Sequence, residues 1–204
     1  MKVEIYQSDA GSPRADDNLG TIYYKHRNYD LGEEIISGDV IEWLEDELGI
    51  AHAYEYSNDR VRELSERYCE KFIALPLYLY DHSGLSLSTS PFSCTWDSGQ
   101  VGFIRAEKSR INEWLGGKYV TKKKRERALE ILEGEIETFN QYLSGDVYGF
   151  RILDDEGDVI DSCGGYYGDD FEENGILDEV FDQWEGTETR EQVLEIINNT
   201  EIEY

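Results

Sequence analysis

Residues that define several common functional classes are scarce in this chain of 204 residues. The cysteines are too few and too far apart for a disulfide framework or a set of zinc ligands: Cys69, Cys94 and Cys163. The histidines show no metal-binding spacing: His26, His52 and His82. The glycine-rich stretch CGGYYGDD at 163–170 lacks the elements that cradle phosphates. We therefore expect reduced thiols, no bound metal and no cofactor.

Long hydrophobic runs are also missing. No segment approaches the roughly 20 apolar residues that cross a membrane. The first ten residues, MKVEIYQSDA, lack the charged and then apolar pattern of a signal peptide. These absences predict a cytoplasmic protein that does not contact a membrane.

Basic residues are outnumbered, with 19 lysines and arginines against 45 acidic residues and a net charge of −26. Such a chain repels nucleic acid, so we expect no direct nucleic-acid binding. The excess is uneven: residues 1–50 carry a net −8, residues 51–153 a net −1 and residues 154–204 a net −17. Two explanations account for this acidity: general salt adaptation, or a focused acidic face that binds a basic partner. The uneven distribution of charge favours the acidic face.

Apolar and aromatic residues are frequent enough, at 39% and 13%, to build a core. Alternating segments predict strands at 3–8, 20–25, 71–80, 85–89, 101–106, 147–153 and 159–162. Helical spacing and capping residues predict helices at 39–48, 59–70, 107–115, 121–143, 174–184 and 189–198. The irregular alternation favours an α+β fold with a mainly antiparallel sheet. We expect one domain over 1–204, with an α+β core at 1–168 and an acidic helical part at 169–204.

Two charged segments lie within or between these predicted elements. The basic run TKKKRER at 121–127 opens the longest predicted helix, where positive charge opposes the helix dipole. It is expected either to pair with the acidic C-terminal part or to serve an external role. The acidic stretch DDEGD at 154–158 lacks the length of a calcium loop and predicts a solvated hairpin turn.

One candidate catalytic group lies around a predicted hairpin with its turn at 81–84. A thiol enzyme needs a cysteine, a histidine within reach and often an acid that orients the histidine. His82 and Cys94 meet this requirement only if the chain after the turn folds back, with Asp81 or Asp97 as the orienting acid. The alternative is a histidine in a turn beside a buried cysteine.

A candidate partner-binding surface lies in the segment DDFEENGILDEVFDQWEGTETRE at 169–191, where carboxylates surround an amphipathic helix. A rigid array of carboxylates can imitate the phosphates of duplex DNA, which carry one charge per roughly 1.7 Å of axis. The alternative is a solvated face on a packed helix. The residues of this candidate surface are Asp169, Asp170, Glu172, Glu173, Asp178, Glu179, Asp182 and Glu185.

Three blocks of the sequence resemble a family of small, uncharacterised acidic proteins from phages and other mobile elements. They are DNLGTIYYKHRNYDLG at 17–32, LPLYLYDHSGLSLSTSPFSCTWDSGQVGFI at 75–104 and ETFNQYLSGDVYGFRILDDEGDVIDSCGGYYG at 137–168. The resemblance implies a role against host defences, of the anti-CRISPR or anti-restriction type, and carries over no functional residue. We therefore expect a non-enzymatic DNA mimic that inhibits a basic, nucleic-acid-binding host protein. The alternative is a small hydrolase or transferase, and the oligomeric state stays open.

Overall fold

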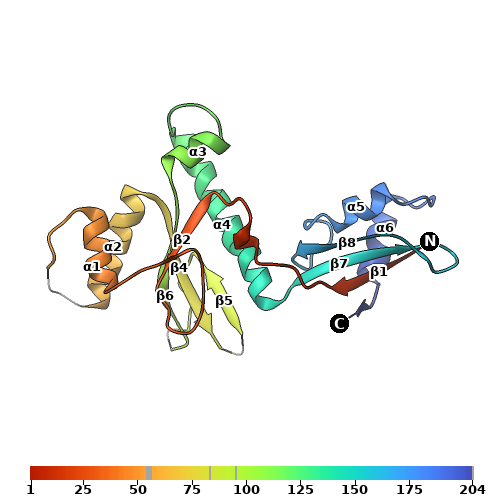
Figure 1. Cartoon of the computed structure of the whole chain (residues 1–204), viewed down its shortest axis with the longest axis horizontal. Coiled ribbons are helices and arrows are strands. Elements are labelled where there is room, and N and C mark those ends of the chain that lie inside the picture. The colour runs from red at the N-terminus through yellow and green to blue at the C-terminus, as the bar shows by residue number, and fades with distance from the viewer. Residues whose placement is uncertain (54–56, 83, 95, 204) are drawn as a thin grey trace. The chain divides into compact units, whose positions relative to one another are not determined.

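The computed structural model describes residues 1–53, 57–82, 84–94 and 96–203. The chain divides into two compact units (Figure 1). The central unit comprises 16–140, and the terminal unit joins 1–15 to 141–204. This division differs from the expected one, because the acidic part at 169–204 shares its unit with both the N-terminal strand and the strands at 147–167.

The expected fold class is confirmed. In the described part of the chain, six α-helices accompany two sheets whose strand pairs are mostly antiparallel. None of the helices in this part combines the length and the apolar character that a membrane crossing requires. The helices are α1 (Val40–Leu48), α2 (Asn58–Lys71), α3 (Lys108–Trp114), α4 (Lys122–Ser144), α5 (Ile176–Asp182) and α6 (Arg190–Asn198), and a short 3-10 helix, η1, covers Pro13–Ala15.

The central unit is built on a five-stranded sheet in the order β3-β2-β6-β4-β5. Its core joins α1 and α2 to the sheet, with the Trp43 ring 5.3 Å from the ring of Tyr68 and 5.9 Å from that of Phe103. The strands are β2 (Gly20–Tyr24), β3 (Glu34–Ile35), β4 (Ile73–Asp81), β5 (Leu85–Ser88) and β6 (Ser98–Ala106).

The predicted hairpin is confirmed as β4 and β5, which pair antiparallel from Tyr78↔Ser88 to Asp81↔Leu85. Ser83 of the predicted turn lies outside the described residues. Because β5 covers only the end of β4, Pro76 has a strand partner on one side alone, and a register shift follows directly after Leu77. A proline without a backbone donor is tolerated in such a place.

Helix α4 explains the basic run at its start. The ammonium of Lys124 donates to the carbonyl oxygens of Gly116 and Tyr119, just after α3, and Arg125 donates to those of Cys69 and Phe72 at the end of α2. A cation is favourable at the C-terminal carbonyls of α2. Arg125 therefore stabilises the end of α2, and Lys124 holds the loop between α3 and α4.

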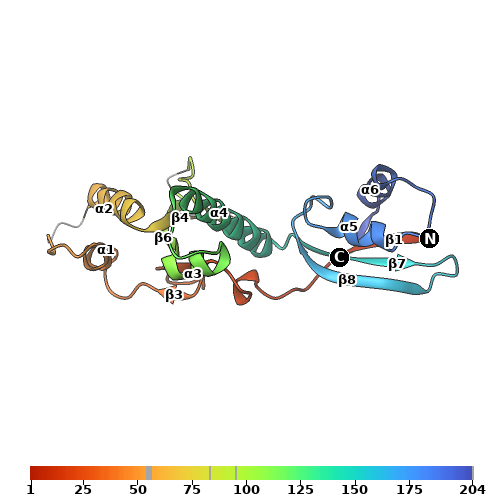
Figure 2. The ribbon, with the colours of Figure 1, turned by 90° about the horizontal axis from the view of Figure 1, so that it is seen from above.

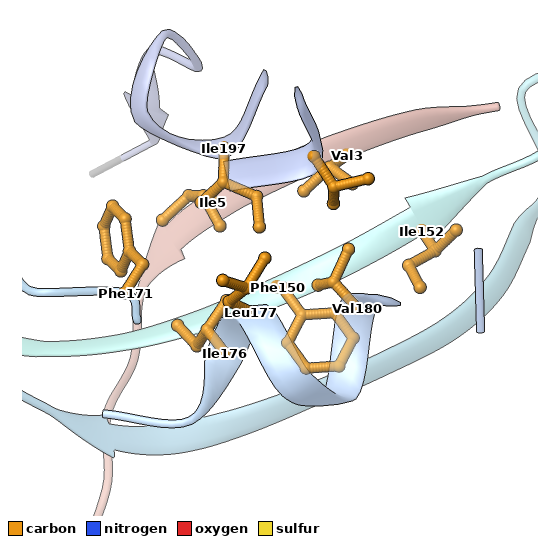
Figure 3. Close-up of a cluster of buried hydrophobic side chains, with 10 residues drawn as sticks. Val3, Ile5, Phe150, Ile152, Phe171, Ile176, Leu177, Val180 and Ile197 are labelled. Atoms are coloured by element: carbon orange, nitrogen blue, oxygen red, sulfur yellow. The ribbon is translucent and has the colours of Figure 1, made fainter. Parts of the chain in front are cut away.

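The terminal unit is built on a four-stranded sheet in the order β8-β7-β1-β9. Helices α5 and α6 lie on one face of this sheet (Figure 2). The strands are β1 (Lys2–Gln7), β7 (Val147–Leu153), β8 (Val159–Tyr167) and β9 (Ile202–Glu203). Figure 3 shows the core between the two layers, formed by Val3, Ile5, Phe150, Ile152, Phe171, Ile176, Leu177, Val180, Val193 and Ile197.

Capping residues set the helix ends as the sequence predicts. The Asp39 carboxylate accepts a hydrogen bond from the Ile41 amide at 2.8 Å, and Gly49 ends α1 with a φ of 70°. At the start of α6, Thr189 and Gln192 form the predicted reciprocal capping box.

Candidate functional site

The acidic segment of the terminal unit is held in a fixed conformation by its apolar residues. Ile176, Leu177 and Val180 are fully buried in the core of the unit, so this face of α5 packs against the sheet. Helical spacing then places the carboxylates between these anchors on the solvent side. All eight predicted partner-binding residues are exposed: Asp169, Asp170, Glu172, Glu173, Asp178, Glu179, Asp182 and Glu185.

Two of the eight carboxylates have structural contacts of their own. Oδ1 of Asp170 accepts hydrogen bonds from the amides of Glu172 at 3.0 Å and Glu173 at 3.1 Å, which fixes the turn before α5. Asp178 forms an ion pair with Arg190, the first residue of α6. Neutralising either side chain would therefore disturb local structure as well as surface charge.

The terminal unit cannot balance its own charge. It holds 21 acidic and 4 basic side chains, a net of −17, whereas the central unit has a net of −9. Lys2 pairs with Glu4, Arg151 with Glu203 and Arg190 with Asp178, all within the same unit. Most of the remaining carboxylates are exposed and together produce a strong negative potential.

A second acidic group lies in the β7–β8 turn, and the sequence interpretation did not include it among the partner-binding residues. Oδ1 of Asp154 accepts from the amides of Glu156 and Asp158 at 3.0 and 2.8 Å, as in a solvated hairpin turn. Asp155 pairs with the N-terminal ammonium at 2.9 Å. The run of acids was visible in the sequence, but its place in the acidic unit depends on the pairing of β7 with β1.

The candidate catalytic residues lie where β4 ends and β6 begins. The backbone amide of Asp81 donates to the carbonyl of Asp97 at 2.9 Å, which brings the two segments together. Nδ1 of His82 is 3.5 Å from Oδ2 of Asp97, and Sγ of Cys94 is 3.7 Å from the same oxygen. The fold therefore does bring His82, Cys94 and Asp97 into one cluster.

The arrangement of this cluster differs from that of a thiol enzyme. In such an enzyme the imidazole contacts the thiol and the acid holds the far side of the ring. Here the Asp97 carboxylate contacts both groups, and the side chains of His82 and Asp97 are 62% and 41% exposed. Asp81 is not part of this cluster and interacts with Tyr29 instead. Their hydrogen bond is the main cause that raises the pKa of the Tyr29 phenol.

Metal binding has no geometric support in the described ranges. No group of three or more histidine, cysteine, aspartate or glutamate side chains there is placed to hold an ion. The other two histidines contact other groups: His26 stacks on Tyr29 with ring centroids 4.8 Å apart, and His52 contacts Asp46 at 3.0 Å.

No family model, no curated protein and no solved structure matches the chain. The relationship to proteins of mobile elements therefore stays a prediction from the sequence blocks.

Proposed function

We propose that the protein is a non-enzymatic interaction protein whose terminal unit presents a rigid acidic surface to a basic, nucleic-acid-binding protein. The observation that carries the proposal is the charge of that unit, 21 acidic against 4 basic side chains, with Lys2, Arg151 and Arg190 paired to carboxylates of the same unit. A surface with this excess attracts cationic clefts and repels nucleic acids and anionic membranes.

The fixed position of α5 supports mimicry of a nucleic acid over simple solvation. The buried anchors Ile176, Leu177 and Val180 hold the carboxylates of the helix in place before any partner arrives. A preorganised array loses little conformational entropy on binding, as a rigid polyanion does. A cleft built for closely spaced phosphates would therefore accept this surface.

The resemblance of three sequence blocks to proteins of mobile elements suggests which class of protein the partner belongs to. The partner would be a host defence protein, such as a restriction or CRISPR enzyme, and the inhibitor would act in the host cytoplasm. A cleft of this kind is rich in lysine and arginine because it must neutralise phosphates. Binding would compete directly with the nucleic acid.

The test is capture of partners from host extract on immobilised protein at low and high salt. We expect a basic DNA- or RNA-binding protein that is released by salt and by added duplex DNA. A variant of the protein tests the surface by removing six carboxylates that have no structural partner in the described part of the chain. Aspartate is changed to asparagine and glutamate to glutamine at Asp169, Glu172, Glu173, Glu179, Asp182 and Glu185.

A matched control removes six exposed carboxylates of the central unit in the same way, at Asp16, Glu66, Glu70, Glu113, Glu133 and Glu137. Both variants have the same net charge, so a difference between them reports the position of the surface. Binding that survives in the first variant, or that falls equally in both, contradicts the proposal.

The alternative function is a small hydrolase or transferase that uses the cluster of His82, Cys94 and Asp97. The observation in its favour is that one carboxylate oxygen lies within 3.7 Å of both the thiol and the imidazole. Cys94→Ala and His82→Ala test it: equal partner capture by both variants is expected from an interaction protein. Loss of a hydrolytic or transfer activity in both would favour the enzyme.

A further inference from the structure

Strand β8 is an open edge of the terminal sheet. It is the outermost strand and pairs only with β7, and no other strand of the described part contacts its outer side (Figures 1 and 2). Such an edge presents unpaired backbone donors and acceptors that can bind another strand. The opposite edge of the same sheet ends in the two-residue strand β9.

Natural sheets protect their edges with charged side chains, proline, β-bulges or a covering helix, and the pairing of β8 with β7 is irregular at Ile160 and at Gly165. Strand β8 has no proline or lysine, and Asp161 is the only charged residue among its nine. It also exposes two large apolar side chains, Val159 at 56% and Ile160 at 52%. In a unit with 21 acidic residues, β8 is thus a weakly charged strand that exposes apolar side chains and an open hydrogen-bonding edge.

We propose that β8 binds β8 of a second copy of this chain in antiparallel fashion, which would join the two terminal sheets across a two-fold axis. Low charge on the strand favours this occupant: two chains of charge −26 can approach only where few carboxylates meet, whereas a basic partner is attracted to the acidic surface of α5 instead. A two-fold axis makes the interface self-complementary.

The ends of the strand determine the register. It begins after the acidic turn that ends at Asp158, and its pairing with β7 is regular only between the irregularities at Ile160 and at Gly165, whose φ is +91°. Pairing of residues 159–165 with their own copy is centred on Ser162. This register places Asp161 opposite the second copy's Cys163, so the two Asp161 carboxylates do not face each other.

The same register brings large side chains opposite small residues. Ile160 of one copy lies opposite Gly164 of the other, and Val159 lies opposite Gly165. Ile160 has no partner in the β7–β8 register, and Gly164 is exposed with the hydroxyls of Ser8 and Tyr6 beside it. The apolar side chains that one copy exposes would therefore be covered by the other.

The oligomeric state is tested with the full chain by sedimentation and light scattering from about 1 to 200 µM. We expect a dimer that strengthens several-fold as salt rises from about 0.05 to 0.5 M, because salt screens the repulsion between like charges. Capture of the basic partner should weaken over the same range, so the two proposals can fail independently. A chain that stays monomeric throughout, or a dimer that salt weakens, overturns the inference.

Ile160→Lys places a charge in the strand and should weaken the dimer at least about tenfold. The lysine lowers the net negative charge, so added repulsion cannot explain that loss. The matched control is Ile35→Lys, at a residue 71% exposed on the two-residue edge strand β3, which should leave the dimer intact. Equal behaviour of the two variants rejects β8 as the interface.

Cross-linking tests the register without weakening the interface. In a chain with Cys94→Ser and Cys163→Ser, Ser162→Cys should form a disulfide between copies, because facing Cα atoms in antiparallel strands are about 4.5–5.5 Å apart. Ser90→Cys, at an exposed residue of the central unit, serves as the control. Equal or slower cross-linking of Ser162→Cys contradicts the register.

Discussion

The ion pair between Glu45 of α1 and Arg60 of α2 gives the sharpest test of what holds the central unit together. Oε1 of Glu45 is 2.8 Å from Nη2 of Arg60, and their side chains are only 1% and 14% exposed. Removing one partner from such a pair leaves a buried charge without compensation, which costs about 3–5 kcal/mol. We expect Arg60→Met to lower the free energy of unfolding by about that amount.

Replacing both partners should behave differently. In Glu45→Met/Arg60→Met no charge stays buried, so the free energy of unfolding should lie within about 1 kcal/mol of the wild type. Arg62→Met is the control on the same helix: its partner is Asp59, and the two side chains are 72% and 84% exposed. An exposed pair of this kind contributes about 0.5 kcal/mol.

Urea unfolding followed by tryptophan fluorescence measures these differences. Three of the four tryptophans, Trp43, Trp96 and Trp114, belong to the central unit, so the signal reports mainly on that unit. If Arg60→Met lowers the free energy of unfolding by less than about 1 kcal/mol, or if the double variant is as unstable as the single one, the ion pair does not contribute as a buried pair.

Two further predictions concern packing and burial. Gly102→Ala should destabilise the protein by more than about 2 kcal/mol, because the new Cβ would lie 1.9 Å from the carbonyl oxygen of Tyr23. Gly134→Ala, in open space on α4, should stabilise the protein by about 0.5–1 kcal/mol in the same urea assay. Similar effects at the two sites would contradict this prediction. Burial raises the pKa of the Cys69 thiol to about 11, so at pH 8 this thiol stays protonated and should react with a thiol reagent at least about tenfold more slowly than exposed Cys163. Labelling followed by mass spectrometry checks this order, and equal rates in the folded protein would show that Cys69 is accessible.

Local chemistry was enough to predict most individual elements. Helix caps such as Asp39 and Thr189 act through hydrogen bonds within a few residues, so the starts of α1 and α6 followed from the sequence. The hairpins of β4 with β5 and β7 with β8 followed for the same reason, because short turns connect adjacent alternating strands. The short strands β3 and β9 were missed, since two residues carry no periodic pattern.

The sequence alone determined the α+β class, the polarity of the charge and the solvent-facing carboxylates of α5, because each depends on composition or on spacing along one helix. Tertiary structure decided which segments share a unit. The antiparallel pairing of β1 with β7 joins Lys2 to Leu153 across nearly the whole chain, and no local pattern specifies such a distant partner. In the central unit, the separate pairing of β4 with β6 brought Asp97 beside His82, and in the terminal unit the strand order left β8 as an open edge.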